Sequence, residues 1–304
     1  MNCITIEQLN NLVKTPEEFI EEGEEFYSAQ LREAADKIFE QRAERPIVLI
    51  SGPSGSGKTT SAARVARLLE SFGCKAHTIS MDNYFLPKHM DEAARDENGE
   101  IDYESPQRLD IKLFKEHLEK LFNCEEIDIP LFDFARQDRD EGMKLRRENG
   151  DIVILEGIHA LNPLLTGDCE AFTIGVYVSV RTRIQNGEEL LHPSKIRLMR
   201  RLMRDKLFRG RSLDETFEFF KSVERGEDMY IMPYKHRADF DVDTFIEYEA
   251  PVYRDILLPE LEKSRGYHDY AAYEDIERFL RLLEPMDRKY VPEHSLIREF
   301  IGTK

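Results

Sequence analysis

The sequence has no apolar run that approaches the roughly 20 residues needed to cross a bilayer. Its first residues, 1–7, also lack the basic segment followed by an apolar one that marks a secretory signal. These two absences predict a cytoplasmic protein with no membrane partner.

Cysteine is scarce, with four in 304 residues, and no two form a Cys-x-x-Cys pair. The wide spacing of Cys3, Cys74, Cys124 and Cys169 argues against a zinc site and against a disulfide framework. We therefore expect buried or unused thiols.

A basic excess is also missing, because the formal net charge is −17. Nucleic-acid backbones are bound by basic surfaces, so no nucleic-acid partner is expected. One segment differs from the rest: residues 195–211 hold eight Lys or Arg and a single acid, Asp205. Any site for a polyanion must therefore be local.

The most informative stretch is Gly-Pro-Ser-Gly-Ser-Gly-Lys-Thr at 52–59, between an apolar run at 46–50 and a helix-like run at 61–69. Glycines let successive N–H groups point at one anion, and the helix adds the positive end of its dipole. The pattern predicts a phosphate-binding loop, in which Lys58 reaches the β- and γ-phosphates and Thr59 binds Mg²⁺. A glycine-rich turn that binds nothing is the alternative. The residues expected to hold the nucleotide are Gly52, Ser54, Gly55, Ser56, Gly57, Lys58, Thr59 and Thr60.

Apolar strands alternate with helix-like segments through the middle of the chain, which predicts a three-layer α/β domain with a parallel central sheet. A cap at Asp110 begins one of these helices. Residues 88–102 are expected to form a loop. The predicted strands are 46–50, 75–80, 127–130, 151–155, 172–180 and 238–246, and the predicted helices are 16–22, 30–43, 61–69, 111–122, 213–235, 252–263 and 270–283.

Two acids follow predicted strands, at the edge where open α/β sheets bind ligands. Asp82, after the second strand, could accept the proton of an attacking hydroxyl, or it could simply cap a turn. Glu156 ends the strand at 152–155, where an acid would join Thr59 in the Mg²⁺ shell. The guanine-binding Asn-Lys-x-Asp and the LSGGQ signature of transport ATPases are both absent.

The basic segment places Arg197, Arg201 and Arg204 on one helix face, with Arg209 and Arg211 at the helix end. A solvated charged face is the usual fate of such a run. In a chain this acidic, an arginine lid that neutralises a transferring phosphoryl group is the stronger interpretation.

Taken in order, these residues resemble the uridine kinase branch of the uridine kinase and phosphoribulokinase family. The resemblance covers about Pro46 to Ile246. Its six blocks are 52–59, Met81-Asp82-Asn83-Tyr84-Phe85, Asp102-Tyr103-Glu104-Ser105-Pro106, Ile129-Pro130-Leu131-Phe132-Asp133-Phe134, Ile154-Leu155-Glu156-Gly157-Ile158, and Arg200 to Asp205 with Arg209-Gly210-Arg211.

The resemblance implies a kinase domain at 46–250, with a lid around 195–211 and helical extensions at 1–45 and 251–304. It implies ATP with Mg²⁺, Asp82 as the base on a nucleoside 5′-hydroxyl, and Glu104 on the ribose hydroxyls. It places Arg201 near the sugar, and Arg204, Arg209 and Arg211 near the ATP phosphates, so that Lys58 and Arg204 act with Asp82 in catalysis. The implied acceptor contacts are Tyr84, Tyr103, Glu104, Phe132, Phe134, Gln137 and Arg201.

The chain departs from the family pattern at the acceptor end. Typical members carry Asp where this chain has Glu104, and a Tyr and a His where it has Phe132 and Gln137. We therefore expect a kinase for the 5′-hydroxyl of uridine or cytidine, with a non-nucleoside alcohol or a non-catalytic nucleotide-binding regulator as alternatives. The closing residues 295–301 either pack back on the domain or form a contact in a homo-oligomer.

Overall fold

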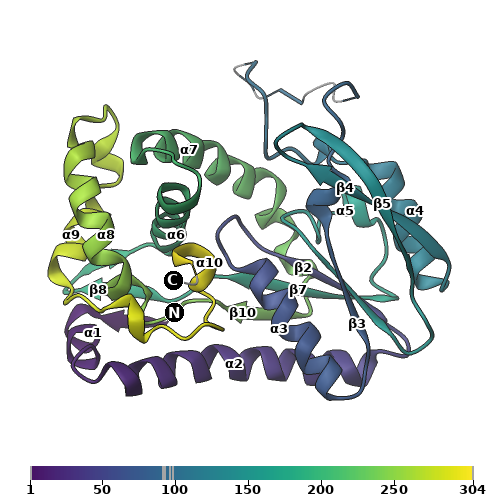
Figure 1. Cartoon of the computed structure of the whole chain (residues 1–304), viewed down its shortest axis with the longest axis horizontal. Coiled ribbons are helices and arrows are strands. Elements are labelled where there is room, and N and C mark those ends of the chain that lie inside the picture. The colour runs from purple at the N-terminus through teal and green to yellow at the C-terminus, as the bar shows by residue number, and fades with distance from the viewer. Residues whose placement is uncertain (1, 91–93, 96, 98, 303–304) are drawn as a thin grey trace.

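Five parallel strands form the centre of the molecule (Figure 1). The computed structural model describes residues 2–90, 94–95, 97 and 99–302. The chain passes from the middle strand, β2, first to one edge and later to the other side, so the strand order reverses beside β2. The predicted α/β fold with a parallel sheet is confirmed. In spatial order the strands are β10 (Phe240–Asp243), β7 (Thr173–Ser179), β2 (Ile47–Ser51), β6 (Ile152–Glu156) and β3 (Ala76–Ser80).

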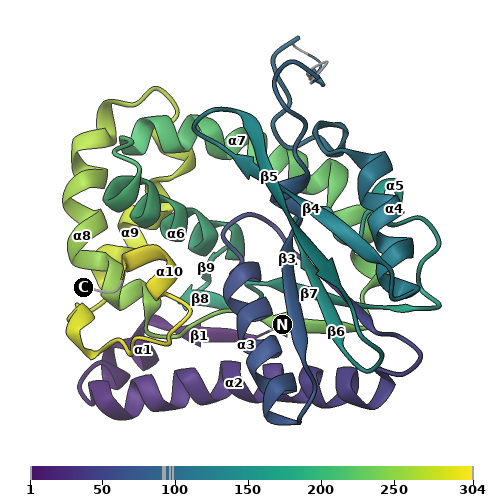
Figure 2. The same cartoon turned by 45° about the vertical axis from the view of Figure 1, so that its right-hand side comes forward.

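Helices cover both faces of this sheet (Figures 1 and 2). Their bounds are α1 (Ile6–Leu12), α2 (Pro16–Gln41), α3 (Lys58–Ser71), α4 (Ile111–Phe122), α5 (Pro163–Thr166), α6 (Pro193–Phe208), α7 (Leu213–Tyr230), α8 (Glu249–Lys263), α9 (Glu274–Leu282) and α10 (Arg298–Ile301).

Alternate residues of β2 face two different cores, because successive side chains of a strand point to opposite sides. Val48 and Ile50 lie in a core that includes residues of α2, α3, α6 and α8. Ile47 and Leu49 lie in a second core, with residues of α4 and α5. The four apolar residues at the start of β2 therefore require cover on both faces of the sheet, as the sequence predicted.

The cap predicted at Asp110 is confirmed, because its carboxylate accepts the Leu113 N–H at 3.1 Å and α4 spans the predicted residues. Other helices differ from the prediction. The helix predicted at 270–283 is divided into a 3₁₀ turn, Tyr270–Ala272, and α9, which begins at Glu274. The segments at 16–22 and 30–43 form one helix, α2, whose buried face includes Gly23, Glu24 and Tyr27 between them. The helix predicted at 213–235 ends at Tyr230, and Pro233 lies in the 3₁₀ turn that follows, since proline lacks the N–H that an α-helix needs.

An antiparallel hairpin of β4 (Glu126–Asp133) and β5 (Asp138–Arg146) stands outside the main sheet. The strand predicted at 127–130 is confirmed within β4, but the loop predicted after it was wrong. Most of β5 is exposed, and its sequence carries no apolar alternation that could have marked a strand. A second small sheet, of β1 (Cys3–Thr5), β8 (Arg183–Asn186) and β9 (Glu189–Leu191), was also not predicted. The loop expected at 88–102 lies partly outside the described residues, and Arg95 and Ile101 form an isolated bridge within it.

Both ends of the chain contribute to one core with the sheet, from Ile4 to Ile301. The four cysteines are free thiols. None of the helices in the described part of the chain is both long and apolar enough for a membrane span.

Candidate active site

The carboxyl ends of three adjacent strands meet at one level of the sheet. Ile50 of β2 pairs with Glu156 of β6, which in turn pairs with Ser80 of β3. The phosphate-binding loop leaves β2 at this level, and Asp82 lies two residues beyond Ser80, in the 3₁₀ turn η1 (Met81–Tyr84). The sheet therefore brings the loop and both predicted acids to one edge.

Glycines shape the loop where other residues would clash. A Cβ on Gly52 would lie 2.0 Å from the Val178 carbonyl oxygen, so the loop passes directly over β7. Gly57, at φ +84°, caps the N-terminus of α3 in the left-handed conformation. The loop therefore leads directly into α3, so the N–H groups of the loop and the positive end of the α3 dipole are available to an anion.

Lys58 begins α3, and its Nζ donates to the Pro53 carbonyl at 3.2 Å. Burial lowers the pKa of Lys58, while the carboxylates of Glu156 and Asp82 oppose this shift. An ammonium held between a phosphate-binding loop and two acids is suited to bridge a triphosphate and the reacting groups.

Asp82 has a raised pKa, chiefly because burial disfavours its charged form and because Glu156 is nearby, whereas Lys58 opposes the rise. A carboxylate with a raised pKa is a better proton acceptor than an ordinary one. The position and the electrostatics of Asp82 fit a general base.

Oxygen ligands for Mg²⁺ are available from Thr59 and Glu156. Glu156 is 7% exposed at the end of β6, and Thr59 is exposed on the first turn of α3. Within the described residues, no group of three or more His, Cys, Asp or Glu could hold a metal ion alone. This donor set suits Mg²⁺, which takes few protein ligands and completes its shell with phosphate oxygens and water.

A buried carboxylate, Asp205, organises the arginines of the basic segment. Its side chain is inaccessible to solvent. Arg204 Nε lies 3.2 Å from Oδ1, Arg209 NH1 3.3 Å from Oδ1, and Arg211 NH1 3.7 Å from Oδ2. The sequence showed Asp205 only as a lone acid among bases. In the fold it neutralises part of the arginine charge and orients the three guanidinium groups.

Other arginines of α6 hold the phosphate-binding loop itself. Arg201 NH1 donates to Ser54 Oγ at 2.6 Å. Burial and the neighbouring Arg204 lower the pKa of Arg201 to about 10. Arg197 was predicted to share the lid face, but it is buried, donates to the Ser54 carbonyl at 3.2 Å and forms an ion pair with Glu227. It therefore supports the loop rather than facing the cleft.

Glu104 faces these arginines from a segment that α7 holds in place. Gly226 of α7 comes so close that a Cβ there would lie 2.3 Å from the Glu104 Cβ. Buried Asp102 accepts the Tyr230 hydroxyl at 2.7 Å and pairs with Arg225 at 2.8 Å. Burial raises the pKa of Glu104 to about 7, against the lowering effect of Arg201 and Lys58.

Three phenylalanines form an apolar wall at the hairpin side. The ring centroids of Phe85 and Phe132, Phe85 and Phe134, and Phe132 and Phe134 are 5.6, 5.6 and 5.0 Å apart. Gln137, at φ +54° in the hairpin turn, donates its amide to the Phe134 carbonyl at 2.8 Å. One face of a planar ligand could stack on this wall.

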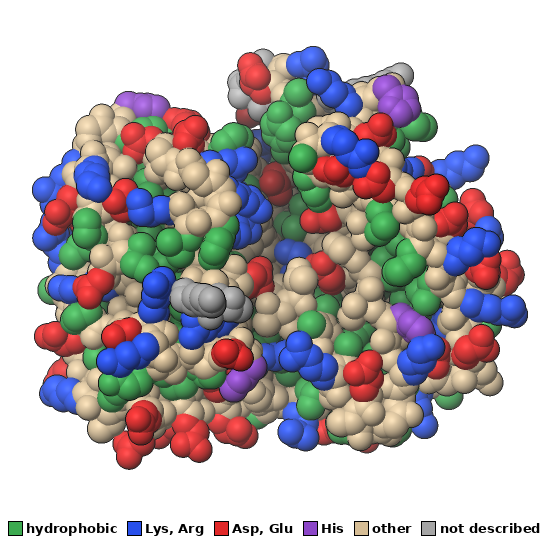
Figure 3. Space-filling model, viewed as in Figure 1, with side chains coloured by type: hydrophobic (Ala, Val, Ile, Leu, Met, Phe, Trp, Pro, Cys, Tyr) green, Lys and Arg blue, Asp and Glu red, His purple; other side chains and the backbone are tan. Residues whose placement is uncertain are grey.

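Many of these groups line one cleft of about 490 Å³, which Figure 3 shows as the hollow between the two halves of the molecule, with basic side chains along one wall. Lys58, Thr59 and Glu156 are not among its lining residues. The predicted residues that line it are Ser54, Asp82, Tyr103, Glu104, Phe132, Phe134, Gln137, Arg201, Arg204, Arg209 and Arg211. Lining residues that the sequence did not single out are Phe85, Arg108, Ile158, Phe219, Ser222 and Val223.

Tyr84 is a correction among the acceptor contacts. Its side chain is fully buried, its hydroxyl lies 2.9 Å from His117 Nδ1, and its ring packs edge-on against Phe114. The neighbouring Phe85 lines the cleft instead. On an irregular turn, neighbouring side chains point in different directions, so Tyr84 faces the core while Phe85 faces the cleft. The surrounding sequence has no periodicity from which these directions could be predicted.

The raised pKa of Glu104 predicts a pH dependence. If the Glu104 carboxylate accepts hydrogen bonds from acceptor hydroxyls, kcat/KM for the acceptor should fall as the pH drops through about 7, because protonation removes the charge that strengthens these bonds. Steady-state rates at saturating ATP would measure this. Glu104→Gln should remove the transition near pH 7 and Glu104→Asp should keep one; an unchanged transition in Glu104→Gln would assign it to another group.

The sequence and the fold of this chain are similar to those of known proteins. Residues 47–249 match the Phosphoribulokinase / Uridine kinase family. The uridine kinase of Staphylococcus aureus (strain JH9) is 32% identical over 195 residues, which cover 64% of this chain and 84% of that protein. Among solved structures, a candidate fructose transport system kinase from Silicibacter sp. TM1040 has a TM-score of 0.50 at 21% identity, over 69% of this chain and 98% of that one. This last likeness shows the fold alone.

Proposed function

Because the chain belongs to the phosphoribulokinase / uridine kinase family of P-loop kinases, we propose that it transfers the γ-phosphoryl group of ATP to the 5′-hydroxyl of a nucleoside, with uridine or cytidine as the first choice. The observation that carries the proposal is the single cleft in which Asp82, the arginines and an aromatic wall meet beside the phosphate-binding loop.

The proposed reaction needs alignment and charge neutralisation more than covalent chemistry. The acceptor hydroxyl lies between Asp82 and the γ-phosphorus, and its oxygen forms the new P–O bond as Asp82 takes its proton. The bond from the γ-phosphorus to the bridging oxygen breaks, and ADP leaves with that oxygen.

Each charged group has a part in this step. Lys58 and the loop N–H groups hold the leaving phosphates, while Arg204, Arg209 and Arg211 neutralise charge on the transferring group. Thr59 and Glu156 would hold Mg²⁺, which would neutralise negative charge on the phosphates. Glu104 and Arg201 would bind the sugar, and the wall of Phe85, Phe132 and Phe134 supports a planar base as the remainder of the acceptor.

Coupled measurement of ADP release with a panel of acceptors tests this proposal. We expect turnover with uridine or cytidine, and little with purine nucleosides or with non-nucleoside alcohols such as a sugar phosphate or pantothenate. Turnover only with a non-nucleoside alcohol would refute the substrate, and ATP binding without turnover on any alcohol would favour a nucleotide-binding regulator.

A further inference from the structure

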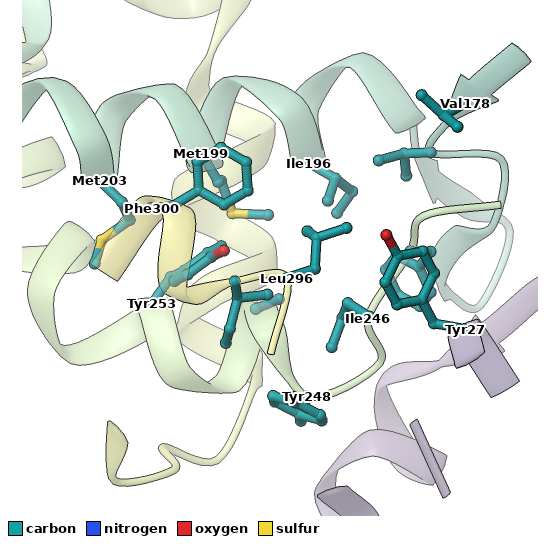
Figure 4. Close-up of a cluster of buried hydrophobic side chains, with 14 of the residues drawn as sticks. Tyr27, Val178, Ile196, Met199, Met203, Ile246, Tyr248, Tyr253, Leu296 and Phe300 are labelled. Carbon is teal, nitrogen blue, oxygen red and sulfur yellow. The ribbon is translucent and has the colours of Figure 1, made fainter. Parts of the chain in front are cut away.

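The C-terminal segment, residues 287–302, lies outside the part of the chain that matches the family and packs against the phosphate-binding loop and the first turn of α3. Leu296, Ile297, Phe300 and Ile301 are buried in the same core as β2. Figure 4 shows Leu296 and Phe300 among Ile196 and Met199 of α6 and Tyr253 of α8. The segment is therefore a fixed part of the fold.

Its closest approach to the loop is at Gly57. A Cβ on Gly57 would lie 2.6 Å from Leu296 Cδ1, so the Leu296 side chain rests directly on the residue that caps α3. The ring of Phe300 lies 5.3 Å from the Arg200 guanidinium, whose NH1 donates to the Gly55 carbonyl at 3.1 Å. Two residues of the segment thus support the loop, one directly and one through Arg200.

A polar contact joins the same segment to the nucleotide-binding residues. Thr60 Oγ1 donates to Glu299 Oε2 at 2.7 Å. A hydroxyl has one proton to donate, and an ionised carboxylate can only accept. While this bond exists, the Thr60 hydroxyl can only accept further hydrogen bonds. It cannot donate its proton to a phosphate.

We propose that Glu299 lowers the affinity of the site for nucleotides. It accepts the hydrogen bond of the Thr60 hydroxyl and places a negative charge beside the phosphate-binding loop, until a polyphosphate displaces its side chain. This inference rests on the proposed use of ATP, and it concerns the phosphates only. Glu299 thus acts through Thr60, beside the phosphate-binding loop, although the two residues lie 239 positions apart in the sequence.

The geometry keeps the displacement local. Arg298 fixes the backbone of the segment through its bonds to the carbonyls of Pro292 at 3.3 Å and Gly302 at 3.0 Å. Arg64 of α3 holds the His294 carbonyl as well. Glu299 itself is exposed, so its side chain can rotate into solvent without moving the buried residues on either side.

Calorimetric titration of the full chain with ATP, ADP and adenosine tests the proposal. Glu299→Gln should bind ATP and ADP about three- to ten-fold more tightly than the wild type, and adenosine equally, because only the phosphates meet the charge and compete for the Thr60 proton. The gain should shrink as salt is raised. Glu293→Gln, an exposed acid on the same segment, should bind all three ligands as the wild type does.

A double-mutant cycle separates the hydrogen bond from the charge. In a Thr60→Val background, Glu299→Gln should give a smaller gain, because no hydroxyl proton remains to compete for. Equal or weaker nucleotide binding by Glu299→Gln would overturn the inference and leave the proposed function intact. Tighter binding without phosphoryl transfer to any alcohol would keep the inference and overturn the function; a wild type that binds no ATP would overturn both.

Discussion

Asp82→Asn should lower kcat by about 10²- to 10⁴-fold, the range that a positioned general base contributes. Asparagine matches the carboxylate in shape but cannot accept the proton of the acceptor hydroxyl. The affinity for ATP should stay close to that of the wild type or increase slightly, because a negative charge near Lys58 is removed. Single-turnover rates with the preferred acceptor, together with ATP titration, would measure both quantities.

The pH profile adds an independent readout for this variant. Since burial and Glu156 raise the pKa of Asp82, the acidic limb of the wild-type profile should lie above the pH at which an ordinary aspartate titrates. Asp228→Asn, an exposed acid on α7, serves as the control and should leave kcat unchanged. An Asp82→Asn enzyme that retained most of its kcat would contradict the base role.

Glu249→Ala should cost about 3–5 kcal/mol of unfolding free energy, because it leaves a fully buried guanidinium without its counter-charge. Glu249 and Arg200 are both inaccessible to solvent, with Oε2 2.7 Å from Nε and Oε1 2.9 Å from NH2. Such a loss is a large part of the roughly 5–15 kcal/mol that stabilise a typical protein. Urea unfolding would measure it, and ATP affinity should fall with it because Arg200 also holds the Gly55 carbonyl.

An exposed pair of similar geometry provides the matched control. Glu33 and Lys37 lie 2.6 Å apart on α2, with side chains 69% and 44% exposed. Glu33→Ala should leave the urea midpoint close to that of the wild type, since water screens the charges and solvates whichever remains. If Glu249→Ala lost no more unfolding free energy than Glu33→Ala, the buried pair of Glu249 and Arg200 would not stabilise the protein more than an exposed pair does.

The features that the sequence predicted well are those encoded by neighbouring residues. The glycines at 52–57 with Lys58 form a local pattern that is typical of a phosphate-binding loop, and the apolar run before it specifies a strand covered on both faces. The Asp110 cap was predictable for the same reason, because it needs only a side chain and an N–H three residues away.

The hairpin at 126–146 and the orientation of Tyr84 are features that local sequence patterns do not predict. Strand β5 is mostly exposed, so its residues are free to be polar and carry no period. Tyr84 ends a 3₁₀ turn and Phe85 follows it, and no local pattern distinguishes the two aromatic side chains. The packing of Phe114 and His117 against one ring decides that the other faces the cleft.

Short-range patterns of glycine, charge and hydrophobicity were sufficient to predict that this protein folds as a parallel α/β domain with a phosphate-binding loop. The roles of its arginines and of its C-terminal segment depend on long-range packing, which no local pattern encodes. Arg200 and Arg201 are neighbours on one helix, yet one is buried against Glu249 and the other lines the cleft, because a helix turns about 100° per residue and the surrounding elements decide which direction is interior. The contact of Glu299 with Thr60 joins residues that only the complete fold brings together.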